Sequence, residues 1–433
     1  MGGIEHLSRT RKSYNRIHCD ACTKSVSKIK LIYLYFFVFA TIYIEFGYRM
    51  VVANSLSGTV RTLLLLVICV PLGFSLLRFK FQWRPVVLFA YLSCIIFINI
   101  LRDTETGNYI LLFVPLFIGF ITSVTVRFDH LVHVFTNIMV FLAAFSLVLL
   151  LIRVLQPGVL GSLPYLGQVY ETRARAHDGF FAVTILNSQY IRNYGLAWEP
   201  GAFAILLSSA LYCKLTFYKK ISVVHIAILT IALITTFSTM GYFVLAIIYI
   251  VSLKRGFKNK KATIIVLIGV VLLLVSFVLL PESVKDLVFS KISGLFTGSA
   301  TETTQARLDA IEYPGKAFFS SPVLGVGYDR FSFINQVYCN NVATNTIANW
   351  FAIMGILFGL PSTYGYLSFA TKCTRYSRGN IVTFLVLAFG FVLMVSTESL
   401  LRISFIYTVI FYGVQNNLFW KNAECIAHKH HDR

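Results

Sequence analysis

Charged residues are scarce in this chain. Only 13% of its 433 residues are Asp, Glu, Lys or Arg, whereas 57% are hydrophobic, and the mean hydropathy is +0.74. Soluble domains contain about 25% charged residues, so this composition excludes an ordinary soluble domain. Apolar runs of about 20 residues, the length that crosses a bilayer, recur along the chain. The sequence therefore predicts an all-α, polytopic integral membrane protein.

Charges are also missing from the centres of the apolar runs. Glu45 and Arg153 lie near the outer ends of their runs. Ion-coupled transporters usually need ionisable groups within the membrane, so a proton-driven carrier is disfavoured. We predict about twelve membrane spans, near residues 31–48, 60–77, 86–101, 109–126, 131–154, 201–217, 222–237, 240–253, 262–280, 346–370, 381–397 and 402–419.

Cysteine offers little for disulfides or metal sites. Of the eight cysteines, only Cys339 falls in a predicted outer loop, so no intramolecular outer disulfide is expected. The C-x-x-C pair of Cys19 and Cys22 has no second pair nearby, which argues against a structural zinc site. We expect no metal and no cofactor.

Positive charge is abundant and unevenly distributed. The formal net charge is +20, and with the N-terminus in the cytoplasm the inner segments hold 25 of the 38 Lys and Arg residues. This is the positive-inside pattern of membrane proteins, and it explains the charge without a nucleic-acid partner. The predicted topology has a basic cytoplasmic tail (1–30) with no signal peptide, a transmembrane domain (31–420) and a cytoplasmic tail (421–433).

Two predicted outer loops, 155–200 and 281–345, are much longer than the others. The outer segments and outer span ends carry ten arginines but only three lysines. The arginine side chain is a planar fork that can hold phosphate or carboxylate by two hydrogen bonds. This bias favours anion recognition on the outer face, with structural salt bridges to the outer acids as the alternative.

The stretch "RNYGLAWEPGAF" ends the first long loop. Pro200 suits the first turn of a helix, and Arg192 precedes it by eight residues. The free N–H groups of that helix terminus and Arg192 could together hold an anionic headgroup. A salt bridge between Arg192 and Glu199 that braces the loop is the alternative.

The second long loop contains "TETTQARLDAIEYPGKAFFSSPVLGVGYDRF". We expect Arg307 in a short helix that ends before Pro314. Gly325 and Gly327 follow, but no strand precedes them, so they indicate a tight turn close to the membrane and not a nucleotide site.

Two polar stretches flank the last spans. In "NNVATNTIANW", Asn345 suits either sugar hydroxyls, which amides can bind as donor and acceptor, or the cap of the following helix. In "STESLLRIS", Glu398 and Arg402 are four residues apart, and an ion pair on one helix face is the simpler interpretation.

Together and in this order, these stretches resemble the Wzy-type O-antigen polymerase and O-antigen ligase superfamily. Arg192–Gly201, Arg307–Gly327 and Thr344–Asn345 carry the resemblance, which spans about residues 130–420. It implies a GT-C-like fold, a location in the bacterial inner membrane and an active site that faces the periplasm.

The resemblance also implies the chemistry. Members use oligosaccharides linked to undecaprenyl pyrophosphate as donor and acceptor, and the glycosyl transfer inverts the anomeric carbon without a nucleotide sugar or a required metal. Membrane lipid and a chain-length regulator are the further partners. The catalytic residues implied here are Glu199, which orients or deprotonates the attacking hydroxyl, with Arg192 and Arg307. The residues implied to bind the pyrophosphate or the substrate are Arg192, Arg307, Arg330, Arg402, Tyr194 and Asn345.

The chain departs from the family pattern at two points. Some polymerases place Arg and Gly eleven residues apart in both loops, whereas Arg192 and Gly201 are nine apart. Thr344 stands where ligases carry a histidine, so a polymerase is favoured. The alternatives are an O-antigen ligase that transfers polymer to lipid A core, and a flippase or transporter of the lipid-linked glycan.

Overall fold

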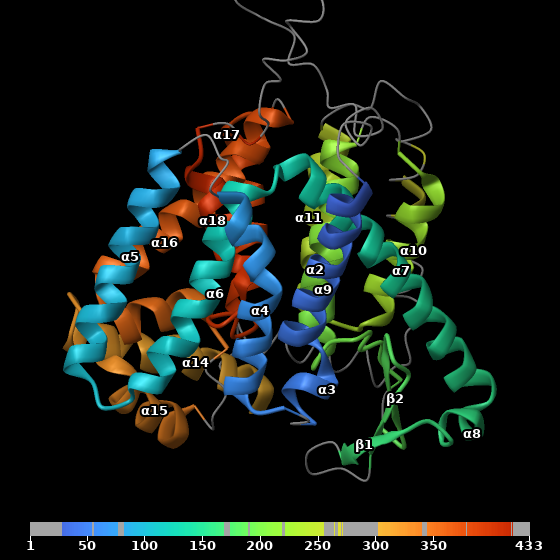
Figure 1. Ribbon diagram of the computed structural model, residues 1–433. Helices are drawn as coiled ribbons and strands as arrows, with labels where there is room; N and C mark the ends of the chain where they lie inside the picture. The colour runs from blue at the N-terminus through green and yellow to red at the C-terminus, as the bar shows by residue number, and fades with distance from the viewer. Residues whose placement is uncertain are drawn as a thin grey trace, which may run out of the picture.

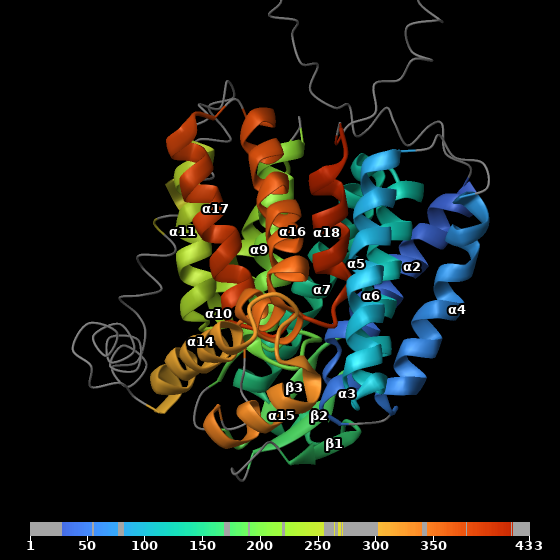
Figure 2. The ribbon, with the colours of Figure 1, turned by 90° about the vertical axis from the view of Figure 1, so that its left-hand side faces the viewer.

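The computed structural model shows apolar helices that stand side by side (Figures 1 and 2). The residues that it describes are 28–53, 56–76, 82–168, 174–188, 191–218, 221–254, 264, 267–269, 271, 302–339, 344–377, 379–416 and 418. The Cys19–Cys22 pair, most of both predicted tails and most of the predicted span 262–280 lie outside these residues.

The described chain is mostly helical. Its helices are α2 (Lys28–Phe46), α3 (Tyr48–Val51), α4 (Gly58–Leu76), α5 (Trp83–Arg102), α6 (Thr106–Thr125), α7 (Phe128–Leu155), α8 (Pro157–Leu160), α9 (Pro200–Phe217), α10 (Val223–Thr235), α11 (Thr239–Lys254), α14 (Glu302–Ser320), α15 (Gly327–Tyr338), α16 (Thr346–Tyr376), α17 (Ile381–Ser396) and α18 (Ser404–Val414). Six of them (α2, α5, α6, α7, α9 and α16) are long and apolar enough to cross a membrane. Five shorter apolar helices accompany them: α4, α10, α11, α17 and α18.

Burial differs between the helices as a membrane environment requires. Helix α9 is apolar all round and lies inside the bundle, with Phe203 and Leu207 fully buried. Helices α4 and α5 instead present large apolar side chains outward: Val67 is 67% exposed and Phe97 59% exposed. Such surfaces are stable against lipid tails but not against water, which supports the prediction of an integral membrane protein.

The first long loop contains a feature that the sequence did not predict. Residues 165–186 form a three-stranded antiparallel sheet of β1 (Tyr165–Gln168), β2 (Arg175–Asp178) and β3 (Val183–Leu186), in the order β1-β2-β3. The fold is therefore mostly, not entirely, α-helical. The strands are four residues long, too short for apolar alternation to be visible in the sequence.

The two long loops lie at the same end of the bundle, as predicted. Helix α8 and the sheet lie there together with α14 and α15 (Figures 1 and 2). We call this end, formed by residues 155–200 and 302–345, the loop face.

Helix α14 continues through Pro314 to Ser320, so the prediction that it ends before the proline is wrong. Proline removes only one N–H donor, the helix packs against α16, and Ala310 and Ala317 are buried on either side of the proline. These contacts offset the missing hydrogen bond.

The turn after α14 docks into a break in α16. Gly355 has a φ of 69° inside α16, and the amide of Ile356 donates to the carbonyl of Pro322 at 2.8 Å. A Cβ on Gly325 would lie 2.3 Å from the carbonyl carbon of Ile353, so only glycine fits. The expected tight turn is confirmed, and its partner is the interrupted helix α16.

Candidate active site

The segment between β3 and α9 is held rigidly by its own polar side chains and backbone. Asn193 donates to the hydroxyls of Ser146 and Thr235 and accepts from the amide of Gly195. The amide of Trp198 donates to the carbonyl of Phe46, and the two aromatic rings stack at 5.2 Å between centroids. The segment therefore presents its charged residues in fixed positions.

Arg192 binds the end of a neighbouring helix and does not form the alternative salt bridge with Glu199. Its Nε and Nη2 donate to the carbonyls of Thr236 and Phe237, at 3.1 and 3.2 Å, just after α10. These carbonyls have no partner within their helix, so a cation is favourable there. Burial lowers the pKa of Arg192, and the charge of Arg307 acts in the same direction, whereas Tyr194 and Glu199 oppose them.

Glu199 and Pro200 stand at the start of α9. Pro200 occupies its first turn, as predicted, and Glu199 is the residue before it. The Glu199 carboxyl is exposed to a cavity and is hydrogen bonded to the carboxyl of Glu398 from the α17–α18 connection. Trp198 is hydrogen bonded to Glu398 as well. A Cβ on Gly201 would lie 2.2 Å from Oε1 of Glu398, so this glycine makes room for the carboxyl pair.

The two carboxyls share one site, and their pKa values reflect it. Burial raises the pKa of Glu398 well above its usual range, and the neighbouring Glu199 raises it further. Burial also raises the pKa of Glu199, while Arg192, Arg307 and the hydrogen bond from Glu398 act in the opposite direction. The opposite effects of the shared hydrogen bond on the two pKa values make Glu398 the donor of this bond and Glu199 the acceptor.

Arg307 reaches the same place from the second long loop. It lies on α14, where its side chain is exposed, and its charge affects the pKa values of Arg192, Glu199 and Glu398. Arg307 thus lies near Arg192 and the predicted base Glu199, although more than 100 residues separate it from both along the chain.

A cavity of about 420 Å³ opens at this point. Its polar lining includes both members of the carboxyl pair together with two further arginines, one from the first turns of α4 and one from the α17–α18 connection. The polar and aromatic lining residues include Arg61, Trp198, Glu199, Thr344, Glu398 and Arg402.

Three other predicted site residues, Tyr194, Asn345 and Arg330, do not line the cavity. Tyr194 lies close enough to Arg192 and Glu199 for its pKa to respond to both. Asn345 caps α16, because its side chain accepts from the amide of Ala348 at 3.0 Å, so the capping interpretation is correct. Arg330 is exposed on α15 and is not part of the lining of the described cavities.

The expected ion pair between Glu398 and Arg402 does not form. Residues 397–403 connect two helices and are not helical, so the four-residue spacing does not place both side chains on one helix face. Arg402 instead donates to the side chain of Asn108 at 2.7 Å and lies over the ring of Tyr328.

Sequence reasoning missed Glu398 and Arg61 as members of this site. The sequence pattern indicates an ion pair with Arg402 for Glu398 and no particular role for Arg61. The available signal was their position at the outer ends of predicted spans, where a charge without a helical partner must be satisfied by another segment.

No protein-family model, curated protein or solved structure matches the chain. Across the described ranges, no group of three or more His, Cys, Asp or Glu residues has the arrangement of a metal site. The chemistry that this site can perform follows from its own side chains: a hydrogen-bonded carboxyl pair in the wall of a cavity, with two arginines near it that repel each other.

Proposed function

We propose that the protein is a membrane-embedded glycosyltransferase that polymerises oligosaccharide repeat units linked to a polyprenyl pyrophosphate. The observation that carries the proposal is the Glu199–Glu398 pair in the wall of a cavity, with Arg192 and Arg307 close enough for their charges to lower the pKa of Glu199. The full proposal includes twelve spans, a GT-C-like arrangement in the bacterial inner membrane and a loop face in the periplasm.

The arginines suit the leaving group of such a reaction. When the bond between the anomeric carbon and the phosphate oxygen breaks, negative charge builds on the pyrophosphate. Hydrogen bonds to two carbonyls hold Arg192 in position, Arg307 is exposed on α14, and no carboxylate lies within ion-pair distance of either among the described residues. Preorganised cations of this kind stabilise a developing anion without reorganisation.

The carboxyl pair suits the attacking group. A hydroxyl of the acceptor sugar forms the new bond to the anomeric carbon as the bond to the pyrophosphate breaks, and its proton passes to the carboxylate of Glu199. The raised pKa of Glu199 brings it closer to neutral pH, where a general base is most effective. Glu398 touches Glu199 and orients it.

An apolar cavity next to the site suits a polyprenyl tail. This cavity, of about 130 Å³, is lined by side chains that include Phe37, Phe135 and Phe405, and Glu45 borders both it and the polar cavity. A lipid pyrophosphate needs an apolar surface that adjoins an anion site, and the two cavities adjoin at Glu45.

The surface polysaccharide of a strain that lacks the gene tests the proposal. We expect complementation with the wild-type chain or with Arg175→Ala, an exposed arginine on β2, to restore a polymer ladder, and Arg192→Ala or Arg307→Ala to restore only single units. Full ladders from both site variants would reject the polymerase. Polymer that accumulates on its lipid carrier in the deletion strain would indicate the ligase, and single units trapped inside the cell would indicate the flippase.

A further inference from the structure

A second pair of arginines lies directly in the wall of the cavity. Arg61, in the first turns of α4, and Arg402, between α17 and α18, both line it and are close enough to repel each other. Arg192 and Arg307 are not part of this lining. The cavity wall therefore has a cationic group of its own, distinct from the Arg192–Arg307 group.

Arg402 is held in place by neutral partners. Its Nη2 donates to Oδ1 of Asn108 at 2.7 Å, and its guanidinium lies 5.5 Å from the centre of the Tyr328 ring. Within the part of the chain that the structure describes, no carboxylate lies within ion-pair distance of Arg61 or Arg402. The position of Arg402 is thus fixed, and neither arginine is paired with a carboxylate among the described residues.

The acids of the cavity are engaged elsewhere. Glu199 and Glu398 are hydrogen bonded to each other, and Oε1 of Glu45 accepts the amide of Ser404 at 2.9 Å. The hydroxyl of Thr344, in the same lining, is buried and has no hydrogen-bond partner among the described residues. Two cations and an unsatisfied hydroxyl around one space are the donors that a phosphate group needs.

The position of α4 provides a route for a lipid-borne anion. Leu63, Val67 and Val70 of this helix are exposed, as expected of side chains that contact lipid tails. Arg61 lies in the same helix, near its loop-face end. An anion attached to a lipid can therefore approach from the bilayer beside α4 without crossing the protein core.

We propose that Arg61 and Arg402, with the hydroxyl of Thr344, form a second anion site for a phosphate or pyrophosphate group, separate from that of Arg192 and Arg307. If the chain is the polymerase proposed above, on which this assignment of roles rests, both reactants carry a lipid pyrophosphate. The Arg192–Arg307 group then holds the pyrophosphate that leaves, and the Arg61–Arg402 group holds the one that stays on the acceptor.

Binding stoichiometry of the purified full-length chain tests the second site without requiring activity. We expect calorimetric titration with farnesyl pyrophosphate to give two equivalents for the wild type and for the control Arg175→Gln. Arg61→Gln and Arg402→Gln should each bind one equivalent, and Arg61→Lys should keep two with weaker affinity at one site. Farnesyl pyrophosphate should bind more tightly than inorganic pyrophosphate, because the site receives a lipid-borne group.

One equivalent for the wild type, or two for Arg61→Gln, would overturn the second site. Equal affinities for farnesyl and inorganic pyrophosphate would overturn its assignment to a lipid-borne anion. A melting temperature measured on each variant separates a lost site from a lost fold, and Arg61→Lys preserves the charge if the glutamine variant does not fold.

Kinetics separates this inference from the proposed function. In a reconstituted polymerisation, Arg61→Gln should raise the KM for the acceptor unit about 10- to 100-fold with little change in kcat, the loss expected from charge-assisted hydrogen bonds to a bound reactant. Arg307→Gln should instead lower kcat. If the Arg192 and Arg307 variants lose their polymer ladders but the wild type binds only one equivalent, the second site is rejected. The proposed polymerase activity is then still supported.

Discussion

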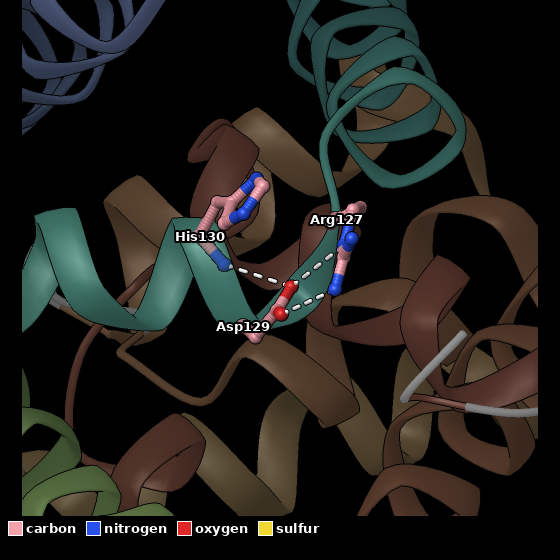
Figure 3. Close-up of polar contacts among 3 residues, drawn as sticks. All are labelled: Arg127, Asp129 and His130. Atoms are coloured by element: carbon pink, nitrogen blue, oxygen red, sulfur yellow. Dashed lines mark hydrogen bonds and ion pairs between the residues drawn. The ribbon is translucent and has the colours of Figure 1, made fainter. Parts of the chain in front are cut away.

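Arg127, at one end of the bundle, and the arginines of the candidate site, at the other, are satisfied in opposite ways. At the end opposite the loop face, Arg127 precedes α7 and forms two hydrogen bonds with Asp129, from Nε to Oδ1 at 3.1 Å and from Nη2 to Oδ2 at 2.7 Å (Figure 3). Oδ1 of Asp129 also accepts the amide of His130. On the loop face, Arg192 binds carbonyls, Arg402 binds an amide, and the carboxyls bond to each other.

This difference separates structural arginines from arginines that are available to a ligand. The charge of Arg127 is neutralised by Asp129 at a helix N-terminus, which completes a local motif and leaves little attraction for an anion. At the candidate site, neutral partners hold the guanidinium groups of Arg192 and Arg402 without cancelling their charge, whereas Asp178 of the loop face pairs with Arg49 at 3.1 Å. Such a site keeps its electrostatic potential for a ligand, and the following changes test whether this distinction holds.

The largest effect is expected at the base. Glu199→Gln keeps the size of the side chain but cannot take a proton, so the polymerisation rate should fall about 100- to 10,000-fold. The melting temperature should change little, because the Glu199 side chain is exposed to the cavity. Initial rates with a lipid-linked repeat unit measure this change. Glu312→Gln, on the exposed face of α14, is the matched control and should keep the wild-type rate. If the rate of Glu199→Gln lies within a factor of three of the control, Glu199 is not the general base.

An intermediate effect is expected in the pH dependence. As pH falls through the pKa of Glu199, the base becomes protonated and activity is lost. The hydrogen bond from Glu398 lowers that pKa, so Glu398→Leu should raise it and move the acidic limb of the rate profile to higher pH. Glu398→Gln keeps an N–H donor and should stay closer to the wild type.

Rate profiles of the three proteins over the neutral and acidic range decide this point. We expect the acidic limb of the wild type to lie at the lowest pH. The limb of Glu398→Gln should lie close to it, and that of Glu398→Leu should lie at the highest pH. A uniform loss of rate without any shift of the limb would mean that Glu398 is only a packing residue. The Gly201 backbone, which makes room for Glu398, would then have a structural role alone.

The comparison also shows how much could be predicted from the sequence. The apolar helices, the shared face of the long loops and the helix that begins at Pro200 follow from local patterns, since each depends on composition over one segment. The approach of Arg192 and Arg307 followed from the resemblance, and the geometry brings both to Glu199. The carboxyl pair could not be predicted, because Glu199 and Glu398 come from connections almost 200 residues apart. The partners of Arg192 could not be predicted either, because the carbonyls after α10 are more than 40 residues away along the chain.

The smallest effect on activity is expected at the paired end. Arg127→Gln removes both hydrogen bonds to Asp129, whose side chain is only 8% exposed, and leaves its carboxylate bonded to the amide of His130 (Figure 3). We expect a loss of about 1–3 kcal/mol in the free energy of unfolding, the range for hydrogen bonds to a charged group that loses its partner. Arg127→Gln/Asp129→Asn should recover part of this loss, because two neutral amides can bond without a buried charge. Thermal melts in detergent measure the stability, and polymer ladders should stay at wild-type length in both variants. Shortened ladders at wild-type stability would contradict the distinction, because a neutralised arginine far from the loop face would then contribute to the reaction.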